Sequence, residues 1–171
     1  EKLDPSLSTA AFTQYVRDDA GVLSDKTEEA IGLYNANWDK MFGSIMAVVT
    51  TESANDIENA AYDYATEMQL AENDAILVIA KQQQDYYLLA SGDFYDLLSG
   101  LSQSFVASCM ADNVQKGDYD AAVRSLCAAL HVELSQQYQQ SEAALDEAAN
   151  GVMFIMILII FLSLIHISEP T

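Results

Sequence analysis

The chain has 171 residues, 51% of them hydrophobic, and its formal net charge is −19 because 26 acidic side chains face only seven basic ones. A chain of this length and apolar content can bury one core. Negative charge on this scale repels phosphate backbones, which argues against a nucleic-acid partner. The same charge suits a domain that meets cations or basic surfaces. The acids are spread along the chain, as solvated surface charge usually is.

The first half of the chain alternates helix and strand signals. Residues 1–14 contain no apolar h-region and are interpreted as a leader or linker. Ser24 is a suitable N-cap for a helix whose apolar residues recur at helical spacing and which ends at Gly43. The short apolar runs at 44–50 and 75–80 predict buried strands with a helix between them.

The next segments complete a small sheet. A polar turn leads to residues 86–90, which predict a third strand antiparallel to the second one. Strand, helix and strand in succession predict a right-handed parallel crossover. Two further helices are expected over residues 95–112 and from about 118 past 134. The predicted fold class is therefore α/β, a three-layer α/β/α sandwich with a small mixed sheet.

The C-terminal end is apolar and then changes character. Residues 152–161 carry no polar side chain, whereas a membrane-spanning helix needs about 20 apolar residues. Residues 162–171 are what the DNA string CTGTCTCTTATACACATCTCCGAGCCCACG encodes, codon by codon, and that string is typical of a transposase-type sequencing adapter. We therefore interpret 151–161 as the start of a truncated transmembrane helix, and we exclude the adapter-like residues from functional argument.

The charge beside this apolar segment predicts its orientation. No Lys or Arg occurs after Arg124, and the linker at 140–150 carries only negative charge. Positive charge marks the cytoplasmic flank of a membrane helix. We expect a single-pass protein of the cell membrane, with its folded domain on the extracytoplasmic side. The membrane is thus its first expected partner.

One family resemblance covers residues 15–139, nearly the whole soluble part. The opening stretch "YVRDDAGVLSDKTEEAI" resembles the opening motif of the TPM domain family, whose members are named after a thylakoid acid phosphatase, a photosystem repair protein and an acetylcholine-receptor modulator. Bacterial members are commonly exported and membrane-anchored. The resemblance implies an interaction or assembly-support module with a protein partner; the alternative is a metal-dependent acid phosphatase. Three later stretches continue it: "IMAVVTT", "NDAILVIAKQQQDYYLLAS" and "KGDYDAAVRSL".

Three aspartates are the candidate metal ligands. Asp18 and Asp19 precede Gly21 in the opening motif, and Asp74 lies just before the second buried strand. Hard cations take oxygens from carboxylates and carbonyls, so Asp18, Asp19 and Asp74 predict a site for calcium or another divalent cation. The competing interpretation is that Asp18 or Asp19 hydrogen-bonds turn amides ahead of Gly21. Both interpretations stay open at this point.

Catalytic residues are not assigned. A Ser-His or Cys-His arrangement needs a histidine, and His131 in the last soluble helix is interpreted as a plain helix residue. Phosphate hydrolysis with a bound divalent ion is the enzymatic alternative, because the ion supplies the Lewis acid and the activated water. Such a site gains from a cationic group, for which Arg17, Lys81 and Lys116 are the candidates.

The two cysteines, Cys109 and Cys127, fall on the two late helices. In an oxidising exterior they could form a disulfide. They are equally well explained as small buried residues.

Overall fold

The computed structural model describes residues 2–97 and 102–167, and it confirms the predicted fold class. One sheet has the strand order β1-β2-β3-β4. β1, β2 and β3 run parallel, and β4 runs antiparallel to β3 as expected. The sequence predicts three of these strands; β1 is missed because three residues are too few to show a periodicity. The strands are β1 (Val16–Asp18), β2 (Met46–Thr51), β3 (Ala75–Ala80) and β4 (Asp85–Ala90).

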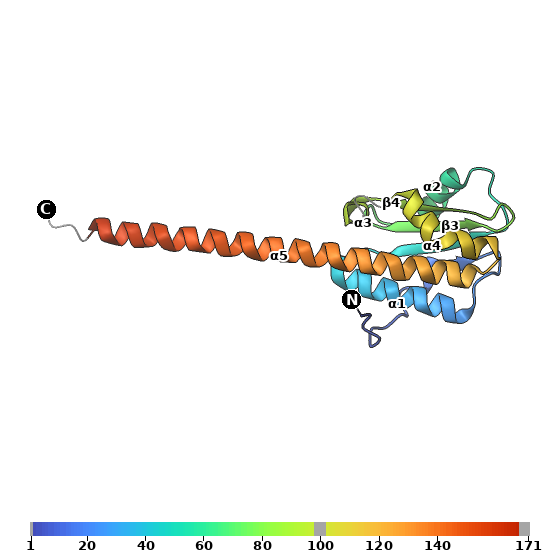
Figure 1. Cartoon of the computed structure of the whole chain (residues 1–171), viewed down its shortest axis with the longest axis horizontal. Helices are drawn as coiled ribbons and strands as arrows, with labels where there is room; N and C mark the ends of the chain where they lie inside the picture. Colours follow the sequence, from blue (N-terminus) through green and yellow to red (C-terminus); the bar gives the residue numbers. More distant parts are fainter. Residues whose placement is uncertain (1, 98–101, 168–171) are drawn as a thin grey trace. The chain divides into compact units, whose positions relative to one another are not determined.

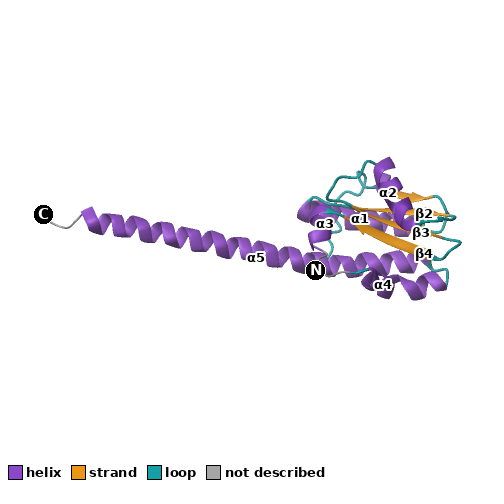
Figure 2. Ribbon diagram, turned by 90° about the horizontal axis from the view of Figure 1, so that it is seen from above, coloured by secondary structure: helices purple, strands orange, loops and turns teal. Residues whose placement is uncertain are grey.

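Helices cover both faces of the sheet. In two views, α2 lies on one side of the sheet, and α4 with the first turns of α5 lies on the other (Figures 1 and 2). The single helix expected over residues 95–112 is two helices, α3 and α4, and residues 98–101 between them lie outside the described part of the chain. The helical elements are η1 (Thr13–Tyr15), α1 (Asp25–Phe42), α2 (Ile57–Glu67), α3 (Gly92–Leu97), α4 (Gln103–Gln115) and α5 (Tyr119–Ile167).

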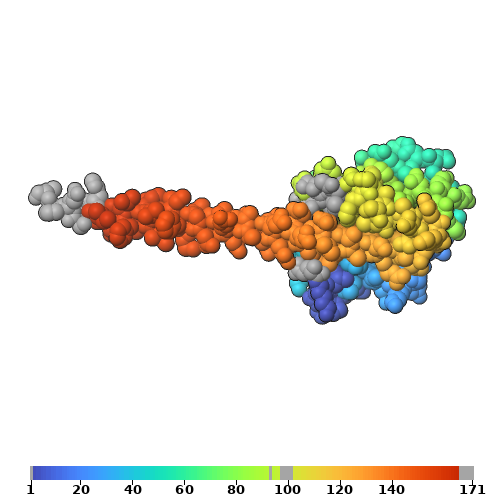
Figure 3. All heavy atoms as spheres, viewed as in Figure 1, coloured from blue at the N-terminus to red at the C-terminus, as the bar shows by residue number. Residues whose placement is uncertain are grey.

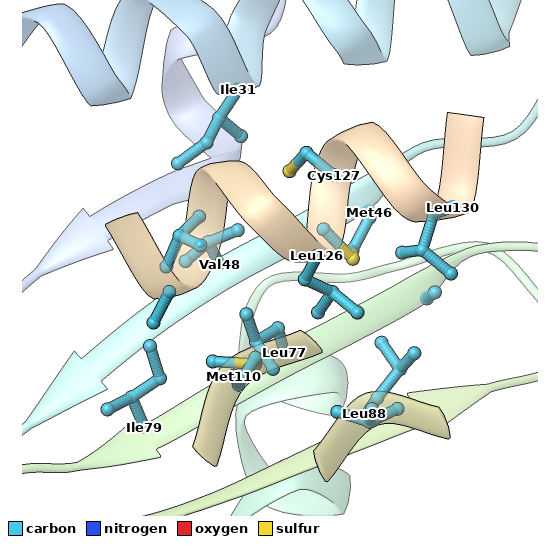
Figure 4. Close-up of a cluster of buried hydrophobic side chains, with 14 of the residues drawn as sticks. Ile31, Met46, Val48, Leu77, Ile79, Leu88, Met110, Leu126, Cys127 and Leu130 are labelled. Atoms are coloured by element: carbon cyan, nitrogen blue, oxygen red, sulfur yellow. The ribbon is translucent and has the colours of Figure 1, made fainter. Parts of the chain in front are cut away.

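The core consists of two clusters, one on each face of the sheet. Successive side chains of a strand point to opposite faces, so Leu77 joins the cluster under α1, α4 and α5, whereas Val78 joins the cluster under α2. Figure 4 shows part of the larger cluster, where Leu126 and Leu130 of α5 point toward the sheet. Burial on both faces explains why β2 and β3 read as continuous apolar runs.

The predicted ends of α1 are confirmed. Ser24 is its N-cap, and the Ser24 side chain accepts a hydrogen bond from the backbone N–H of Thr27 at 3.4 Å. Gly43 ends the helix with φ of 69°, in the left-handed region that glycine adopts without a Cβ clash. The N-terminal segment packs against this helix, because the backbone N–H of Asp4 donates to Asn37 Oδ1 at 2.8 Å.

The chain divides into two units, Glu1–Ser135 and Gln136–Thr171, and the second contains the rest of α5. The stretch 140–150, predicted as an acidic linker, is helical throughout. The apolar side chains between Val152 and Ile165 are exposed in the structure, and α5 contains an 18-residue stretch with a mean hydropathy of 2.6. The helix is therefore long and apolar enough to cross a membrane.

A buried asparagine fastens α1 to the first residue of β2. Asn35 is fully buried; its Nδ2 donates to the carbonyl of Met46 at 2.9 Å, and its Oδ1 accepts from the N–H of Met46 at 2.8 Å. The two bonds satisfy both backbone groups of one strand residue. The side-chain amide thereby fixes where the strand starts relative to the helix.

Replacing Asn35 by alanine should lower the free energy of unfolding by about 3 kcal/mol, because it leaves two buried backbone groups without partners. The measurement is urea unfolding of the detergent-solubilised chain, followed through the fluorescence of Trp38, the single tryptophan and a fully buried one. Asn55→Ala, at an exposed position, is the control and should change the free energy by less than about 0.5 kcal/mol. Equal effects of the two substitutions would contradict the role of Asn35.

Candidate functional site

The carboxyl ends of the three parallel strands meet at one edge of the sheet. Asp18 ends β1, Thr51 ends β2, and Lys81 follows β3. In open α/β sheets ligands bind beyond the carboxyl ends of the strands. We therefore expect a ligand site at this end of the sheet, which we call the carboxyl edge.

At the carboxyl edge, Asp18 organises a turn. Its carboxylate accepts hydrogen bonds from the backbone N–H of Val22 at 3.1 Å and of Leu23 at 2.9 Å, and also from the hydroxyl of Thr50. Gly21 sits in the turn with φ of 61°. The interpretation of Asp18 as a turn-shaping residue is confirmed. Its oxygens are consequently engaged by the protein itself.

Asp19 belongs to an exposed ion-pair group. Its Oδ2 lies 2.8 Å from Nε of Arg17, while Nη1 of Arg17 lies 2.8 Å from Oε1 of Glu67. The guanidinium also stands 5.5 Å from the ring centroid of Tyr64. Hydrogen bonds to Glu67 and Asp19 raise the pKa of Arg17. Exposed pairs of this kind stabilise a fold little, so the group mainly holds Arg17 in place.

Asp74 has a structural role of its own. Its Oδ1 accepts from the backbone N–H of Ile45 at 3.0 Å, and its Oδ2 accepts from that of Ala71 at 2.9 Å. These bonds close the loop before β3 and join it to the loop before β2. Both carboxylate oxygens thus serve the backbone.

Asp74 does not share a site with Asp18 and Asp19. It precedes Ala75, the first residue of β3, whereas Asp18 lies in the same row as Ile79 through the pairing with β2. Five residues along a strand correspond to about 16 Å. The expectation that these three aspartates converge is wrong in this respect, because the starts and ends of parallel strands lie at opposite edges. Across residues 2–97 and 102–167, no three His, Cys, Asp or Glu side chains are grouped closely enough to hold a metal ion.

The acidic residues that do gather near Asp18 come from the start of α1. Asp25, Glu28 and Glu29 line a hollow of about 250 Å³ between α1 and the N-terminal segment. Burial, then the negative charges of Asp18 and Asp25, raise the pKa of Glu28. These acids are not among the site residues that the sequence predicts. The signal that could have identified them is their place directly after the Asp18 turn. The hollow is completed by Thr9, Thr13, Val16 and Gly32.

Asp120 links α5 to the same region, and it too is absent from the site that the sequence predicts. Its Oδ1 accepts from the backbone N–H of Ser24 at 2.9 Å and from the Ser24 hydroxyl at 2.8 Å. Burial alone would raise the pKa of Asp120, but hydrogen bonds from Ser24 and Thr27, together with the charge of Arg124, lower it. Asp120 therefore acts as an ionised acceptor that ties two helix starts together.

The cationic groups suggested for phosphate chemistry are not gathered at one point. Arg17 is held by Asp19 and Glu67, and Lys81 lies 3.2 Å from Glu52. Lys116 is the exposed C-cap of α4. The candidates for contacting a phosphate are thus dispersed or engaged with acids.

His131 and the cysteines have structural environments. His131 is buried, and its Nδ1 accepts a hydrogen bond from Nε1 of Trp38 at 3.2 Å. Cys109 and Cys127 are free thiols. Burial raises the pKa of the Cys127 thiol to about 12, so that thiol stays protonated and unreactive at neutral pH.

Comparisons with known proteins agree with this fold. Residues 16–133 match the family model of the TPM domain. The chain belongs to the TPM domain family. Three NMR structures of bacterial proteins share its fold. The N-terminal domain of a P. gingivalis protein is 19% identical with a TM-score of 0.63, and the match covers 81% of this chain and 96% of that one.

The other two structures are more distant in sequence. The N-terminal domain of cg2496 from Corynebacterium glutamicum is 14% identical with a TM-score of 0.54, covering 76% of this chain and 83% of that one. The BA42 protein from Bizionia argentinensis is also 14% identical, with a TM-score of 0.52, covering 67% of this chain and 83% of that one. These likenesses establish the TPM fold alone. No curated protein matches the chain.

Replacing Glu28 by glutamine should stabilise the protein at neutral pH. Because the pKa of Glu28 is raised, the folded state holds its proton more tightly than the unfolded state, so stability falls as pH rises through the carboxyl range. Glu28→Gln removes that loss and should raise the melting temperature by about 2 °C at pH 7, since solvent screening keeps the effect below 1 kcal/mol. The difference should vanish near pH ~3.5, where Glu28 is protonated in both states.

Melting curves of wild type and Glu28→Gln across this pH range provide the measurement. Glu29→Gln, an exposed position beside it, is the matched control. A difference between Glu28→Gln and wild type that does not vary with pH would contradict the electrostatic explanation.

Proposed function

We propose that this protein is a membrane-anchored, extracytoplasmic TPM domain that acts as an interaction or assembly-support module and binds a divalent cation in the acidic hollow beside the first turns of α1. The membrane part rests on the candidate spanning segment of α5. The cation part rests on the acids that surround Glu28. The membrane segment would keep the domain, and any protein partner bound to it, close to the membrane.

The raised pKa of Glu28 is the observation that supports cation binding most directly. It shows that a carboxylate here is disfavoured by burial and by the charges of Asp18 and Asp25. A bound cation would relieve both costs, because an opposite charge favours the ionised form. The proposed site is therefore the hollow beside Asp25 and Glu28, and it replaces the set of Asp18, Asp19 and Asp74.

The chemistry of the hollow suits a hard cation. Carboxylates from Asp25, Glu28 and Glu29 line it together with two threonines, Thr9 and Thr13. Calcium takes six to eight oxygen ligands in flexible geometry and accepts waters among them. The three acids are not grouped closely enough to hold a metal ion by themselves. Their carboxylate oxygens, the threonine hydroxyls and bound waters together would supply the ligands that calcium needs.

The charge around the membrane segment supports the extracytoplasmic side. The chain has no Lys or Arg after Arg124, whereas acidic residues flank the segment on its N-terminal side at positions 142, 146 and 147. Positive charge is retained on the cytoplasmic side of a membrane helix, so a flank of this kind favours export. An exported position would also expose the acidic hollow to the calcium concentrations that weak extracellular sites use.

Calcium should raise the melting temperature of the full chain in detergent micelles. At a concentration of about ten times Kd, a ligand that binds only the folded state should give a rise of about 4 °C. Asp25→Asn combined with Glu28→Gln should abolish the rise while leaving the fold intact, since neither side chain caps a backbone group in the way Asp18 does. Asp63→Asn, at an exposed position of α2, is the matched control and should keep the full response.

An unchanged calcium response in the double variant would exclude this hollow as the site. Hydrolysis of a generic aryl phosphate, measured in the same samples, tests the phosphatase alternative. Turnover that requires the metal and is lost in the double variant would favour the enzyme. A calcium response without turnover would favour the binding module.

The orientation is tested by protease accessibility in a bacterial host that expresses the chain. The domain should be degraded when protease is added to intact spheroplasts, because it lies outside the cytoplasmic membrane. A cytoplasmic marker protein in the same cells must stay intact, as the control for lysis. Protection of the domain under these conditions would show that it faces the cytoplasm.

A further inference from the structure

The sheet has an open edge at β4. β4 pairs with β3 on one side and is the last strand in the sheet order. In an antiparallel pair, alternate residues direct both backbone groups away from the neighbouring strand. The side chain of Gln103 bonds the carbonyl of Leu88, which identifies Tyr86, Leu88 and Ala90 as the residues whose groups point outward. Such an edge is a template for pairing with another strand.

Two side chains occupy part of this edge. Nε2 of Gln103, on α4, donates to the carbonyl of Leu88 at 2.9 Å, and Oδ1 of Asp85 accepts from the N–H of Tyr86 at 2.9 Å. They stand where the donor and acceptor of an added strand would stand. Within the described part of the chain, no side chain bonds the N–H of Leu88 or the carbonyl of Tyr86. Gln103 and Asp85 are both exposed, so an incoming strand can displace them.

A hollow of about 250 Å³ runs beside this edge and takes side chains from both faces of the sheet. Tyr62 of α2 and Tyr95 of α3 border it, and these two residues are 53% and 61% exposed although large aromatic side chains usually pack. Phe105 and Val106 of α4 line it as well. Figure 3 shows the yellow surface of α4 adjoining the green surface that carries β4. The shape fits an extended segment whose alternate side chains reach the α2 side and the α4 side.

The surroundings of the hollow are acidic. Burial and the charge of Glu58 raise the pKa of Tyr87, which places Glu58 beside the Tyr87 hydroxyl, and Asp85 begins the strand. A neighbouring hollow of about 330 Å³ shares Tyr62 with the first and includes Glu72 and Asp74. Among the described lining residues of the two hollows there is no Lys or Arg. A strand that docks here is therefore selected for positive charge.

We propose that the β4 edge, with the hollow between Tyr62, Tyr95 and Phe105, binds an extended basic segment of a partner protein as a fifth strand. Main-chain hydrogen bonds to the outward groups of Tyr86 and Leu88 supply affinity, as in other cases of strand addition. The tyrosine rings receive apolar side chains, and the surrounding acids select lysine or arginine. This surface is distinct from the cation hollow at the start of α1.

A second copy of the chain is the less suitable occupant. Pairing β4 with β4 would bring the acidic surroundings of two edges together, in a protein whose formal net charge is −19. Like charges across an interface oppose association. A basic segment would instead be attracted by the acids around the edge.

The test uses the full chain in zwitterionic detergent micelles and a fluorescent nonapeptide of alternating lysine and valine, measured by fluorescence anisotropy with empty micelles as background. The basic peptide should bind, and a peptide with glutamate in place of lysine should bind at least tenfold more weakly. Methylating alternate backbone nitrogens should weaken binding about tenfold in one of the two alternations and little in the other, because only one set of N–H groups faces β4.

Variants of the chain give results of opposite sign. Tyr62→Ala removes an exposed ring from the hollow and should weaken peptide binding about tenfold. Gln103→Ala frees the carbonyl of Leu88 and should tighten binding about threefold. Tyr138→Ala, which lines neither hollow, is the matched control and should leave binding unchanged.

Several results would overturn the proposal. These are equal binding of the acidic and basic peptides, equal effects of the two methylation patterns, or weaker binding in Gln103→Ala. Dimerisation of the chain that Tyr62→Ala abolishes would assign the edge to a second copy, and would overturn it as well. Binding should persist without calcium and in the Asp25→Asn, Glu28→Gln double variant, and its loss there would contradict the separation of the two sites.

Discussion

The hydrogen bonds of one carboxylate hold the carboxyl edge of this sheet together. Asp18 accepts from the amides of Val22 and Leu23 and from the hydroxyl of Thr50, so it joins the end of β1, the turn after it and the end of β2. That turn delivers Ser24 as the N-cap of α1, and Asp120 at the start of α5 bonds to Ser24. Two helix starts thus depend on one aspartate, and their acids are brought close as a consequence.

The acids near this edge repel one another, and this repulsion lowers the stability of the folded state. Asp18 and Asp120 are compensated by amide and hydroxyl donors, whereas Glu28 faces the charges of Asp18 and Asp25 without a donor of that kind among the described residues. Uncompensated charge that raises a carboxyl pKa is common where a protein meets a ligand, although structural networks also produce it. An acid that accepts hydrogen bonds from backbone amides, such as Asp18, shapes a turn. An acid beside other acids and without such donors, such as Glu28, is a candidate ligand.

The sequence predicts the fold better than the site, for a physical reason. Apolar periodicity and caps such as Ser24 and Gly43 are local, and they placed α1, β2, β3 and β4 correctly. The set of Asp18, Asp19 and Asp74 required knowing which ends of the strands meet. That depends on register across the sheet, and the three-residue β1 that fixes it carries no pattern of its own. The roles of Asp120 and Glu28 could not be predicted from the sequence for the same reason. Both roles depend on contacts with residues from other segments of the chain.

β4 runs antiparallel to β3 and ends the sheet, which explains why its outer edge is open. After β4 the chain passes into α3, α4 and α5, and buried residues of all three pack in the larger core cluster on one face of the sheet. No described segment is left to pair with the outward groups of Tyr86 and Leu88, and side chains cover part of the edge instead. Side-chain caps keep an edge soluble yet leave it open to displacement, unlike a paired strand. A strand that extends this sheet would therefore have to come from outside the described residues, and the acids around the edge favour a basic one.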